Sequence, residues 1–165
     1  MRPEAGASLI VPLPDAAATG ELARRLAAAL PADTTGWMIL LQGELGAGKS
    51  TLARALLRAL GVEGPVPSPT YTLVEPYEVA GRLMYHIDLY RISSEEELPY
   101  LGWAELRQGL MLIEWPERVA ALRQQADLLI TLDFEGVGRT AMVAALTERA
   151  RSVVAGTAPP GPVES

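Results

Sequence analysis

The sequence predicts an α/β fold with three layers, in which helices cover both faces of a mixed, mainly parallel sheet. Short apolar runs that suit buried strands alternate with helical patterns along the chain, as expected for parallel strands joined by helices. A hairpin signal near the middle adds an antiparallel portion, so the sheet should be mixed. The length of 165 residues suits one domain, and 49% apolar with 21% charged residues is typical of globular proteins.

The first part of the chain contains a strand, a helix and a second strand. Residues 8–13 (SLIVPL) fit a short strand. Leucines recur every four residues over residues 19–30, a spacing that predicts a helix. The continuous apolar run WMILL at residues 37–41 is typical of a strand buried on both faces of a parallel sheet.

A glycine-rich loop and a second helix follow. The loop occupies residues 43–48, and the helix pattern over residues 50–60 ends at Gly61. Glycine suits that position because it readily adopts the left-handed conformation that closes a helix. Three prolines interrupt residues 64–69, so no regular structure is expected there.

The central part contains a hairpin, a short helix and a third buried strand. Two strand-like runs, residues 71–79 and 82–89, flank an Ala-Gly turn and predict the hairpin. Ser94 followed by Glu97 matches a capping box, which predicts the start of a short helix. The run LMLI at residues 110–113 predicts another buried strand.

The last part of the chain has a less specific secondary-structure pattern. Residues 127–134 fit a strand, whereas residues 142–150 fit a strand and a helix equally well. Residues 155–165 contain three prolines and two glycines but almost no large apolar side chain. That composition predicts a disordered tail after a single domain formed by residues 1–154.

The composition excludes several kinds of chemistry. The chain has one histidine and no cysteine. It therefore has no disulfide framework, thiol nucleophile, cysteine-based metal site or multi-histidine metal centre. The net charge of −6 opposes strong autonomous binding to nucleic acid, which needs a basic surface. A partner protein would have to hold any polyanion.

The sequence also indicates a cytoplasmic protein without a membrane partner. No apolar run approaches the roughly 20 residues that span a bilayer. The first residues include Glu4 and prolines, where a signal peptide would have a basic start followed by an apolar core.

The glycine-rich loop carries the strongest functional signal. Residues 43–50 (GELGAGKS) match the phosphate-loop pattern G-x-x-x-x-G-K-[ST] without a mismatch. The glycines let backbone N–H groups converge on a phosphate, and the following helix adds the positive end of its dipole. Lys49, the only lysine in the chain, can reach the β- and γ-phosphates, while the Ser50 hydroxyl can bind Mg²⁺. The sequence therefore predicts a P-loop NTPase-like fold.

Two further carboxylates are candidates for the metal site. Asp88 and Glu114 each end a predicted strand, where a phosphate-loop protein places the carboxylate that orients its metal. ATP is favoured over GTP, because a chain without asparagine cannot carry the guanine-reading N-K-x-D motif. A small-molecule kinase remains an alternative, although no arginine-dense lid segment stands out.

Four ordered motifs and the start of the chain resemble one family. The motifs are GELGAGKST (residues 43–51), SPTYTLVEPY (68–77), YHIDLYRI (85–92) and LIEWPER (112–118), preceded by IVPLPDAAAT (10–19). Together they resemble the bacterial tRNA threonylcarbamoyladenosine biosynthesis ATPase family, the TsaE type, from about residue 10 to residue 139. The resemblance implies a P-loop fold that binds ATP and Mg²⁺ and hydrolyses ATP slowly alone.

The resemblance also implies partners and site residues. The implied partners are TsaB and TsaD, which transfer threonylcarbamoyl to adenosine 37 of tRNA, so this chain would meet tRNA only through them. Lys49, Asp88 and Glu114 are the implied catalytic residues, and Ser50, where many members have threonine, would bind Mg²⁺ with Glu114. The implied nucleotide-binding residues are Thr19, Gly46, Ala47, Gly48, Lys49, Ser50, Thr51, Gly138 and Arg139.

Three interpretations remain open at this point. The leading one is a partner-dependent P-loop ATPase, with the Pro-rich residues 68–72 as a segment that orders around the γ-phosphate. The others are the kinase and a nucleotide-gated adaptor in which hydrolysis is incidental. His86 is interpreted as a packed strand residue hydrogen-bonded to a neighbour. Arg91 could pair with phosphate or with the Glu95–Glu97 cluster, and Trp115 with the nucleotide or a partner.

Overall fold

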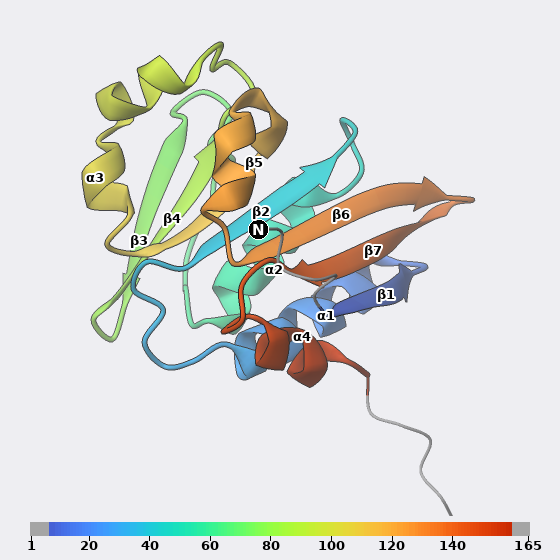
Figure 1. Ribbon diagram of the computed structural model, residues 1–165. Coiled ribbons are helices and arrows are strands. Elements are labelled where there is room, and N and C mark those ends of the chain that lie inside the picture. The colour runs from blue at the N-terminus through green and yellow to red at the C-terminus, as the bar shows by residue number, and fades with distance from the viewer. Residues whose placement is uncertain (1–6, 160–165) are drawn as a thin grey trace, which may run out of the picture.

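The computed structural model describes residues 7–159, in which strands and helices alternate through most of the chain (Figure 1). In chain order the elements are β1 (Ser8–Leu13), α1 (Ala16–Ala29), β2 (Met38–Gly43), α2 (Lys49–Ala59), β3 (Val74–Val79), β4 (Arg82–Asp88), the 3₁₀ helix η1 (Glu95–Leu101), α3 (Trp103–Leu106), β5 (Leu110–Glu114), the 3₁₀ helices η2 (Pro116–Arg118) and η3 (Ala120–Gln124), β6 (Leu128–Glu135), β7 (Gly138–Ala145) and α4 (Arg151–Thr157).

The strands of this range form one seven-stranded sheet with the order β1-β7-β6-β2-β5-β4-β3. Its centre is parallel, because β2 pairs in parallel with both β5 and β6, and β4 pairs in parallel with β5. Its flanks are antiparallel, through β1 with β7, β6 with β7, and β3 with β4. The predicted α/β fold with a mixed sheet is confirmed, and its parallel part is the part that carries the phosphate loop.

Alternate residues of the central strand supply two separate cores. Ile39 and Leu41 of β2 face the core formed with α1, α2 and α4, whereas Met38 and Leu40 face the opposite core. This alternation explains the continuous apolar run, since side chains of successive strand residues point to opposite faces and both faces are covered.

The two covers of the sheet differ in kind. We call the side packed by α1, α2 and α4 the α-helical face; these helices are grouped on one side in Figure 1. We call the other side the short-helix face, because η1, α3 and η3 are the helices that contribute buried side chains to its core. Leu98, Leu106 and Leu122 are examples of these side chains. The predicted three-layer arrangement is therefore present.

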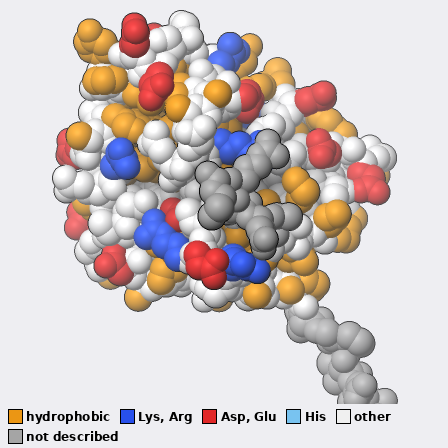
Figure 2. Space-filling model, viewed as in Figure 1, with side chains coloured by type: hydrophobic (Ala, Val, Ile, Leu, Met, Phe, Trp, Pro, Cys, Tyr) orange, Lys and Arg blue, Asp and Glu red, His pale blue; other side chains and the backbone are white. Residues whose placement is uncertain are grey.

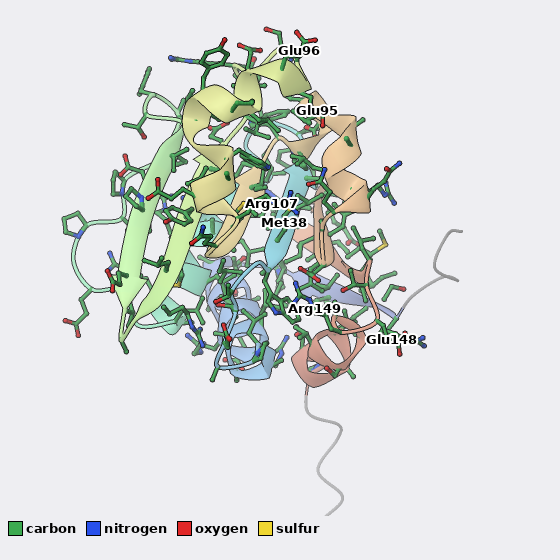
Figure 3. All side chains as sticks on the ribbon, turned by 60° about the vertical axis from the view of Figure 1, so that its left-hand side comes forward. Met38, Glu95, Glu96, Arg107, Glu148 and Arg149 are labelled. Carbon is green, nitrogen blue, oxygen red and sulfur yellow. The ribbon has the colours of Figure 1, made fainter. Side chains whose placement is uncertain are left out.

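Two helix starts are capped by side chains. The Asp15 carboxylate accepts a hydrogen bond from the Ala18 backbone N–H at 2.9 Å, which satisfies a free donor at the start of α1. The predicted capping box of Ser94 and Glu97 is complete, but the helix that follows, η1, is 3₁₀ rather than α. Glu95 and Glu96 of this helix lie at the outer end of the short-helix face (Figure 3).

A buried carboxylate ties the start of β2 to distant parts of the chain. Asp127, directly before β6, accepts hydrogen bonds from the Met38 backbone N–H at 3.0 Å and from Arg149 Nε at 2.7 Å. The Thr147 hydroxyl donates to the same carboxylate at 2.9 Å. The hydrogen bond to Asp127 raises the pKa of Arg149, which is labelled together with Met38 in Figure 3. This network stabilises the amino ends of β2 and β6, at the end of the sheet opposite the phosphate loop.

Two parts of the C-terminal region clarify or correct the sequence interpretation. The ambiguous residues 142–150 contain the end of β7, because β7 pairs with both β1 and β6. The predicted disordered tail was wrong for Ala155, Gly156 and Thr157, which belong to α4, so the boundary predicted after residue 154 falls inside this helix. The predicted tail residues 160–165 lie outside the described residues.

Small residues explain why α4 orders. A Cβ atom at Gly156 would lie 3.0 Å from the Ala29 Cβ, so glycine allows a close approach of α4 to α1. The Thr157 carbonyl also accepts a hydrogen bond from Arg25 Nε at 3.0 Å. The composition that suggests disorder is therefore the composition that this helix contact needs.

The surface of the described part agrees with the acidic composition. Acidic and arginine side chains are scattered among one another on the visible face in Figure 2, and its described part shows no broad basic area. Several arginines are paired with carboxylates, such as Arg24 with Glu21 and Arg151 with Glu148. In residues 7–159 no helix has the length and apolar character that crossing a membrane requires.

Candidate functional site

The glycine-rich loop connects β2 to α2 at the carboxyl end of the parallel strands. A Cβ atom at Gly43 would lie 2.6 Å from the Leu132 carbonyl oxygen of β6, so the loop can leave the sheet here only without a side chain. Gly48 precedes α2 with φ of 107°, a backbone conformation that favours glycine. Both glycines shape the loop so that its N–H groups and the helix start can face one ligand.

Lys49 is the first residue of α2 and is buried, with 4% of its surface exposed. Its ammonium donates hydrogen bonds to the Gly43 carbonyl and, at 3.1 Å, to the Glu44 carbonyl. It also lies 3.8 Å from the centre of the Trp115 ring, a distance at which the ring attracts a cation. Burial lowers the pKa of Lys49, while the nearby carboxylates, Glu114 first among them, oppose this change.

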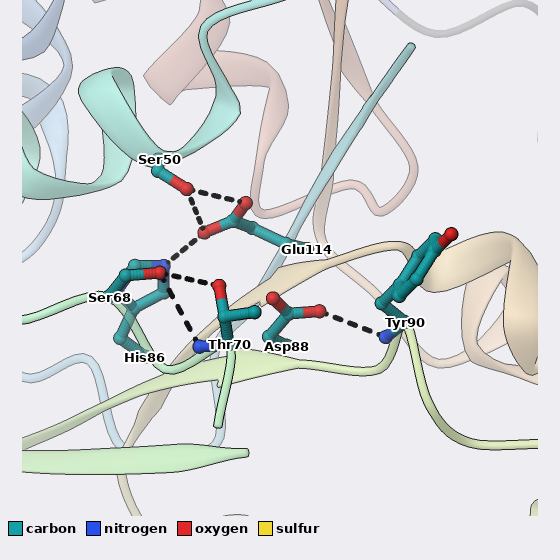
Figure 4. Close-up of polar contacts among 7 residues, drawn as sticks. All are labelled: Ser50, Ser68, Thr70, His86, Asp88, Tyr90 and Glu114. Atoms are coloured by element: carbon teal, nitrogen blue, oxygen red, sulfur yellow. Dashed lines mark hydrogen bonds and ion pairs between the residues drawn. The ribbon is translucent and has the colours of Figure 1, made fainter. Parts of the chain in front are cut away.

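Asp88 and Glu114 end neighbouring parallel strands and face each other in the register of β4 and β5. Both are buried, with 5% and 3% of their surfaces exposed. The Ser50 hydroxyl, one residue into α2, lies 2.9 Å and 3.0 Å from the two carboxylate oxygens of Glu114 (Figure 4). Asp88 instead accepts a hydrogen bond from the Tyr90 backbone N–H at 2.9 Å. The two carboxylates are thus adjacent but have different partners.

His86 is a member of this cluster that the sequence interpretation did not place. Its side chain is fully buried, and its Nε2 atom lies 2.5 Å from an oxygen of Glu114. The interpretation of His86 as a packed strand residue with a hydrogen-bonded neighbour is correct, but the neighbour is a predicted metal ligand. Strand periodicity could have indicated this contact, because His86 lies two residues before Asp88 and so shares its face of β4.

Two cavities lie along the phosphate loop and share Gly46, Gly48 and Thr51. The first has a volume of about 310 Å³ and the second about 250 Å³. The first is lined by Leu45, Gly46, Gly48, Lys49, Ser50, Thr51, Thr70, Asp88, Tyr90, Glu114 and Trp115. The second is lined by Leu13, Pro14, Asp15, Ala16, Thr19, Gly46, Ala47, Gly48, Thr51, Leu132, Val137, Gly138 and Arg139.

The division between the cavities separates the predicted site residues by role. The residues predicted for metal binding and catalysis line the first cavity, whereas Thr19, Gly138 and Arg139, which the resemblance implies as nucleotide-binding residues, line the second. Arg139 connects the second cavity to the loop, because its guanidinium donates to the Gly46 carbonyl at 3.2 Å and lies 4.3 Å from the centre of the Phe134 ring. Sequence reasoning had assigned no site role to Phe134 or to residues 13–16.

The oxygen donors of the first cavity fit Mg²⁺. Ser50 supplies a hydroxyl, and Glu114 and Asp88 supply carboxylates, which are the donors that hard cations prefer. Within residues 7–159 no three His, Cys, Asp or Glu side chains are grouped to hold a metal by themselves. Such a donor set suits Mg²⁺ that arrives with phosphate oxygens and water, as this ion commonly binds.

The predicted switch segment borders the first cavity. Thr70 lines the cavity, and its hydroxyl lies 2.7 Å from the Ser68 hydroxyl. The neighbouring Tyr71 is 81% exposed, and the Arg91 guanidinium lies 5.0 Å from the centre of its ring. Among the described residues Arg91 contacts this ring and not the Glu95–Glu97 cluster, whereas its predicted pairing with phosphate stays a prediction.

Trp115 has an unusual backbone for a large side chain, with φ of 59°. This conformation follows β5 directly and turns the chain into η2. The Trp115 ring lies 5.0 Å from the centre of the Tyr90 ring and covers the Lys49 ammonium. Non-glycine residues at positive φ are energetically costly and often mark functional sites.

A larger cavity of about 590 Å³ lies at the opposite end of the sheet, between the β3–β4 turn, the end of α2 and residues 32–35. None of the predicted site residues lines it. Size therefore does not identify the candidate site in this molecule; the grouping of Lys49, Ser50, Asp88 and Glu114 does.

The sequence is similar to a known family over most of its length. The family model described as "Threonylcarbamoyl adenosine biosynthesis protein TsaE" matches residues 13–141. The tRNA threonylcarbamoyladenosine biosynthesis protein TsaE of Haemophilus influenzae is 40% identical over 119 residues, which cover 71% of this chain and 75% of that protein. The protein of the same name from Synechocystis is 42% identical over 118 residues, covering 68% and 73%.

The fold is also similar to a solved structure. The crystal structure of Bacillus subtilus YdiB matches with a TM-score of 0.73 and covers 92% of this chain and 95% of that one. At 24% sequence identity this likeness concerns the fold. It supports the arrangement of the sheet and its helices that positions the two cavities.

Proposed function

This chain belongs to the threonylcarbamoyl adenosine biosynthesis protein TsaE family, and from that premise we propose that it is the ATP-binding, weakly hydrolysing subunit of a tRNA-modifying machinery. In this proposal it acts with TsaB and TsaD in forming threonylcarbamoyladenosine at adenosine 37 of tRNA. It meets tRNA only through these partners, which suits its acidic composition.

One observation carries the nucleotide part of the proposal. The lysine and serine that open α2 lie in the same cavity as the two carboxylates that end β4 and β5. Phosphate-loop proteins use this combination to hold the β- and γ-phosphates and their metal. The second cavity continues along the loop and offers Thr19, Gly138 and Arg139 to the adenine side.

The side chains have distinct tasks in this site. The loop N–H groups and the Lys49 ammonium bind phosphate oxygens, and Lys49 exchanges its two carbonyl partners for them. Ser50 and Glu114 are the proposed ligands of Mg²⁺, which when bound neutralises charge on the β- and γ-phosphates. Asp88, held by the Tyr90 N–H, orients water or the metal hydration shell. Water then replaces ADP on the γ-phosphorus.

The charges that line the first cavity support a dependence on partners. Among its described lining residues Lys49 is the one cation, whereas fast phosphoryl transfer commonly uses an additional arginine near the γ-phosphate. TsaB or TsaD is expected to supply the missing positioning, so hydrolysis by the free chain should be slow.

Reconstitution of tRNA modification under multiple turnover tests this function. TsaB, TsaD, tRNA and the other substrates are combined with the chain, with its Lys49→Ala variant, or without it. We expect sustained modification only with the unchanged chain. Equal product in all three reactions would contradict the proposal.

A nucleotide-gated adaptor is the second candidate, and exposed apolar side chains at the first cavity favour it. Leu45 is 81% exposed and lines this cavity, and Tyr71 is equally exposed beside Thr70. Complex formation with TsaB and TsaD can be compared in ATP, in ADP and in a non-hydrolysable ATP analogue. If the analogue alone sustains repeated modification, hydrolysis is incidental and the adaptor is the better description.

A further inference from the structure

His86 is a buried polar side chain whose one hydrogen-bond partner among residues 7–159 is Glu114. It lies on β4, next to the edge strand β3, is fully buried, and contacts Glu114 through Nε2 at 2.5 Å. Its other ring nitrogen, Nδ1, is buried without a hydrogen-bond partner. Buried polar atoms are rarely left unpaired, because their lost hydration is then not replaced. An apolar side chain would fill this place in the core without that cost, so the contact with Glu114 is the feature to explain.

The contacts form one line from the sheet to the start of α2. His86 Nε2 meets one oxygen of Glu114, and the Ser50 hydroxyl meets both oxygens (Figure 4). A carboxylate accepts hydrogen bonds, so His86 donates its Nε2–H to Glu114, while Nδ1 has no partner among the described residues. His86 therefore limits the rotation of the Glu114 side chain from below while Ser50 contacts it from above.

We propose that His86 is a positioning residue that holds Glu114 in the orientation needed for binding Mg²⁺ together with Ser50. This inference rests on the proposed function. When Mg²⁺ and phosphate oxygens enter, the Ser50–Glu114 hydrogen bond must give way, whereas the His86–Glu114 hydrogen bond can persist. His86 thus keeps one carboxylate oxygen fixed through the exchange. Hydrogen-bond partners of metal ligands generally act in this way and contribute strongly to metal affinity.

Two amide variants separate positioning from packing. His86→Gln can place an amide N–H where Nε2 now lies, whereas the shorter His86→Asn places its amide near Nδ1 and out of reach of Glu114. The two side chains have the same polar group, so loss of the buried imidazole affects both. Thermal unfolding of each variant monitors the fold.

The main measurement is the affinity for a non-hydrolysable ATP analogue, by calorimetry, in EDTA and at increasing Mg²⁺ concentration. For His86→Asn we expect the affinity for the analogue in EDTA to stay within about threefold of that of the unchanged chain. The Mg²⁺ concentration that gives half of the full increase in this affinity should rise about tenfold or more. His86→Gln should restore most of the Mg²⁺ response. Glu114→Gln is the positive control and should raise the Mg²⁺ requirement at least as much.

The outcomes distinguish this inference from the proposed function. Failure of the unchanged chain to bind the analogue, or binding without any Mg²⁺ effect, would overturn the proposed function itself. If the unchanged chain and Glu114→Gln behave as expected but His86→Asn keeps the ordinary Mg²⁺ requirement, the positioning role is wrong. The role is also wrong if His86→Gln and His86→Asn lose the Mg²⁺ response equally.

A second readout needs no variant of His86. Because the chain has a single histidine, ¹⁵N-labelled histidine gives one imidazole signal once any purification tag is removed. We expect the proton on Nε2 and a slowly exchanging N–H whose shift changes in Glu114→Gln and on adding the analogue with Mg²⁺. An Nε2 without a proton would exclude the donated hydrogen bond and overturn the inference, even if both amide variants fail to fold.

Discussion

The two faces of the sheet have cores of similar character but covers of different regularity. The α-helical face is covered by α1 with 14 residues, α2 with 11 and α4 with seven, whereas the short-helix face is covered by helices of four to seven residues. Long helices satisfy most of their backbone groups internally, while 3₁₀ turns have poorer hydrogen-bond geometry. The comparison teaches that the two faces meet at the site: Lys49 and Ser50 come from α2, whereas Trp115 packs against the core of the short-helix face and covers the Lys49 ammonium.

The largest expected difference concerns core substitutions on the two faces. Leu56→Ala on the buried side of α2 should lower the free energy of unfolding by about 3–5 kcal/mol, because a long helix cannot move inward to close the cavity that the substitution leaves. Leu122→Ala in η3 removes an equally buried leucine but should cost only about 2–3 kcal/mol, because a short helix can move inward. Urea unfolding measures both. Equal losses would mean that the two covers are equally rigid.

Lys49→Met should separate function from stability at the start of the α-helical face. We expect ATP affinity to fall about a hundredfold, or roughly 2.7 kcal/mol, because the ammonium no longer meets the phosphates. The unfolding temperature should stay the same or rise, since burial lowers the pKa of Lys49 and the charged form is therefore disfavoured in the fold. Arg54→Met on the exposed side of α2 is the control and should retain ATP affinity. Unchanged affinity in Lys49→Met would contradict the site.

Removing a helix cap on each face of the sheet should lower stability by about 1 kcal/mol and tests whether the two covers open separately. Asp15→Ala removes the cap of α1 and should lower the free energy of global unfolding, since α1 packs into the core of the α-helical face. Ser94→Ala removes the cap of η1 and should chiefly speed amide hydrogen exchange within that short helix. Urea unfolding and exchange by mass spectrometry measure these effects. A purely global loss in Ser94→Ala would show that η1 does not open separately.

The smallest expected effect is a change in the free energy of unfolding with pH in the alkaline range. Between the lowered pKa of Lys49 and its ordinary value near 10.5, the folded chain binds fewer protons than the unfolded chain. The free energy of unfolding should therefore gain a positive contribution as pH rises through that interval. Urea midpoints across alkaline pH for the unchanged chain and Lys49→Met measure this contribution as a difference. Parallel curves would show that burial does not lower the pKa of Lys49.

The sequence predicted much of the regular part of the molecule. The run WMILL indicated a strand buried on both faces, and β2 is such a strand at the centre of the sheet. The proximity of Asp88 and Glu114 also followed from sequence, because ends of parallel strands meet at one edge. Grouping Thr19 with Arg139 came only from the family resemblance, since 120 residues separate them.

Other features depend on three-dimensional contacts that no local pattern contains. The composition of residues 155–157 suggested disorder, but α1 offers Gly156 a surface on which to pack. The capping box before η1 specified a helix start without specifying that the helix would be 3₁₀. The His86–Glu114 contact depends on the side-chain torsion angles of two residues on neighbouring strands. Strand periodicity could therefore place both side chains on one face of the sheet but could not predict that they contact each other.

The position of β2 between two strands that come much later in the chain has a consequence for synthesis on the ribosome. The phosphate-loop motif emerges early, yet β2 finds its neighbours only when β5 and β6 have been made. The second cavity also needs Gly138 and Arg139. A nascent chain that stops near residue 110 therefore contains the whole motif but no pocket, and nucleotide binding should begin late and abruptly as translation proceeds.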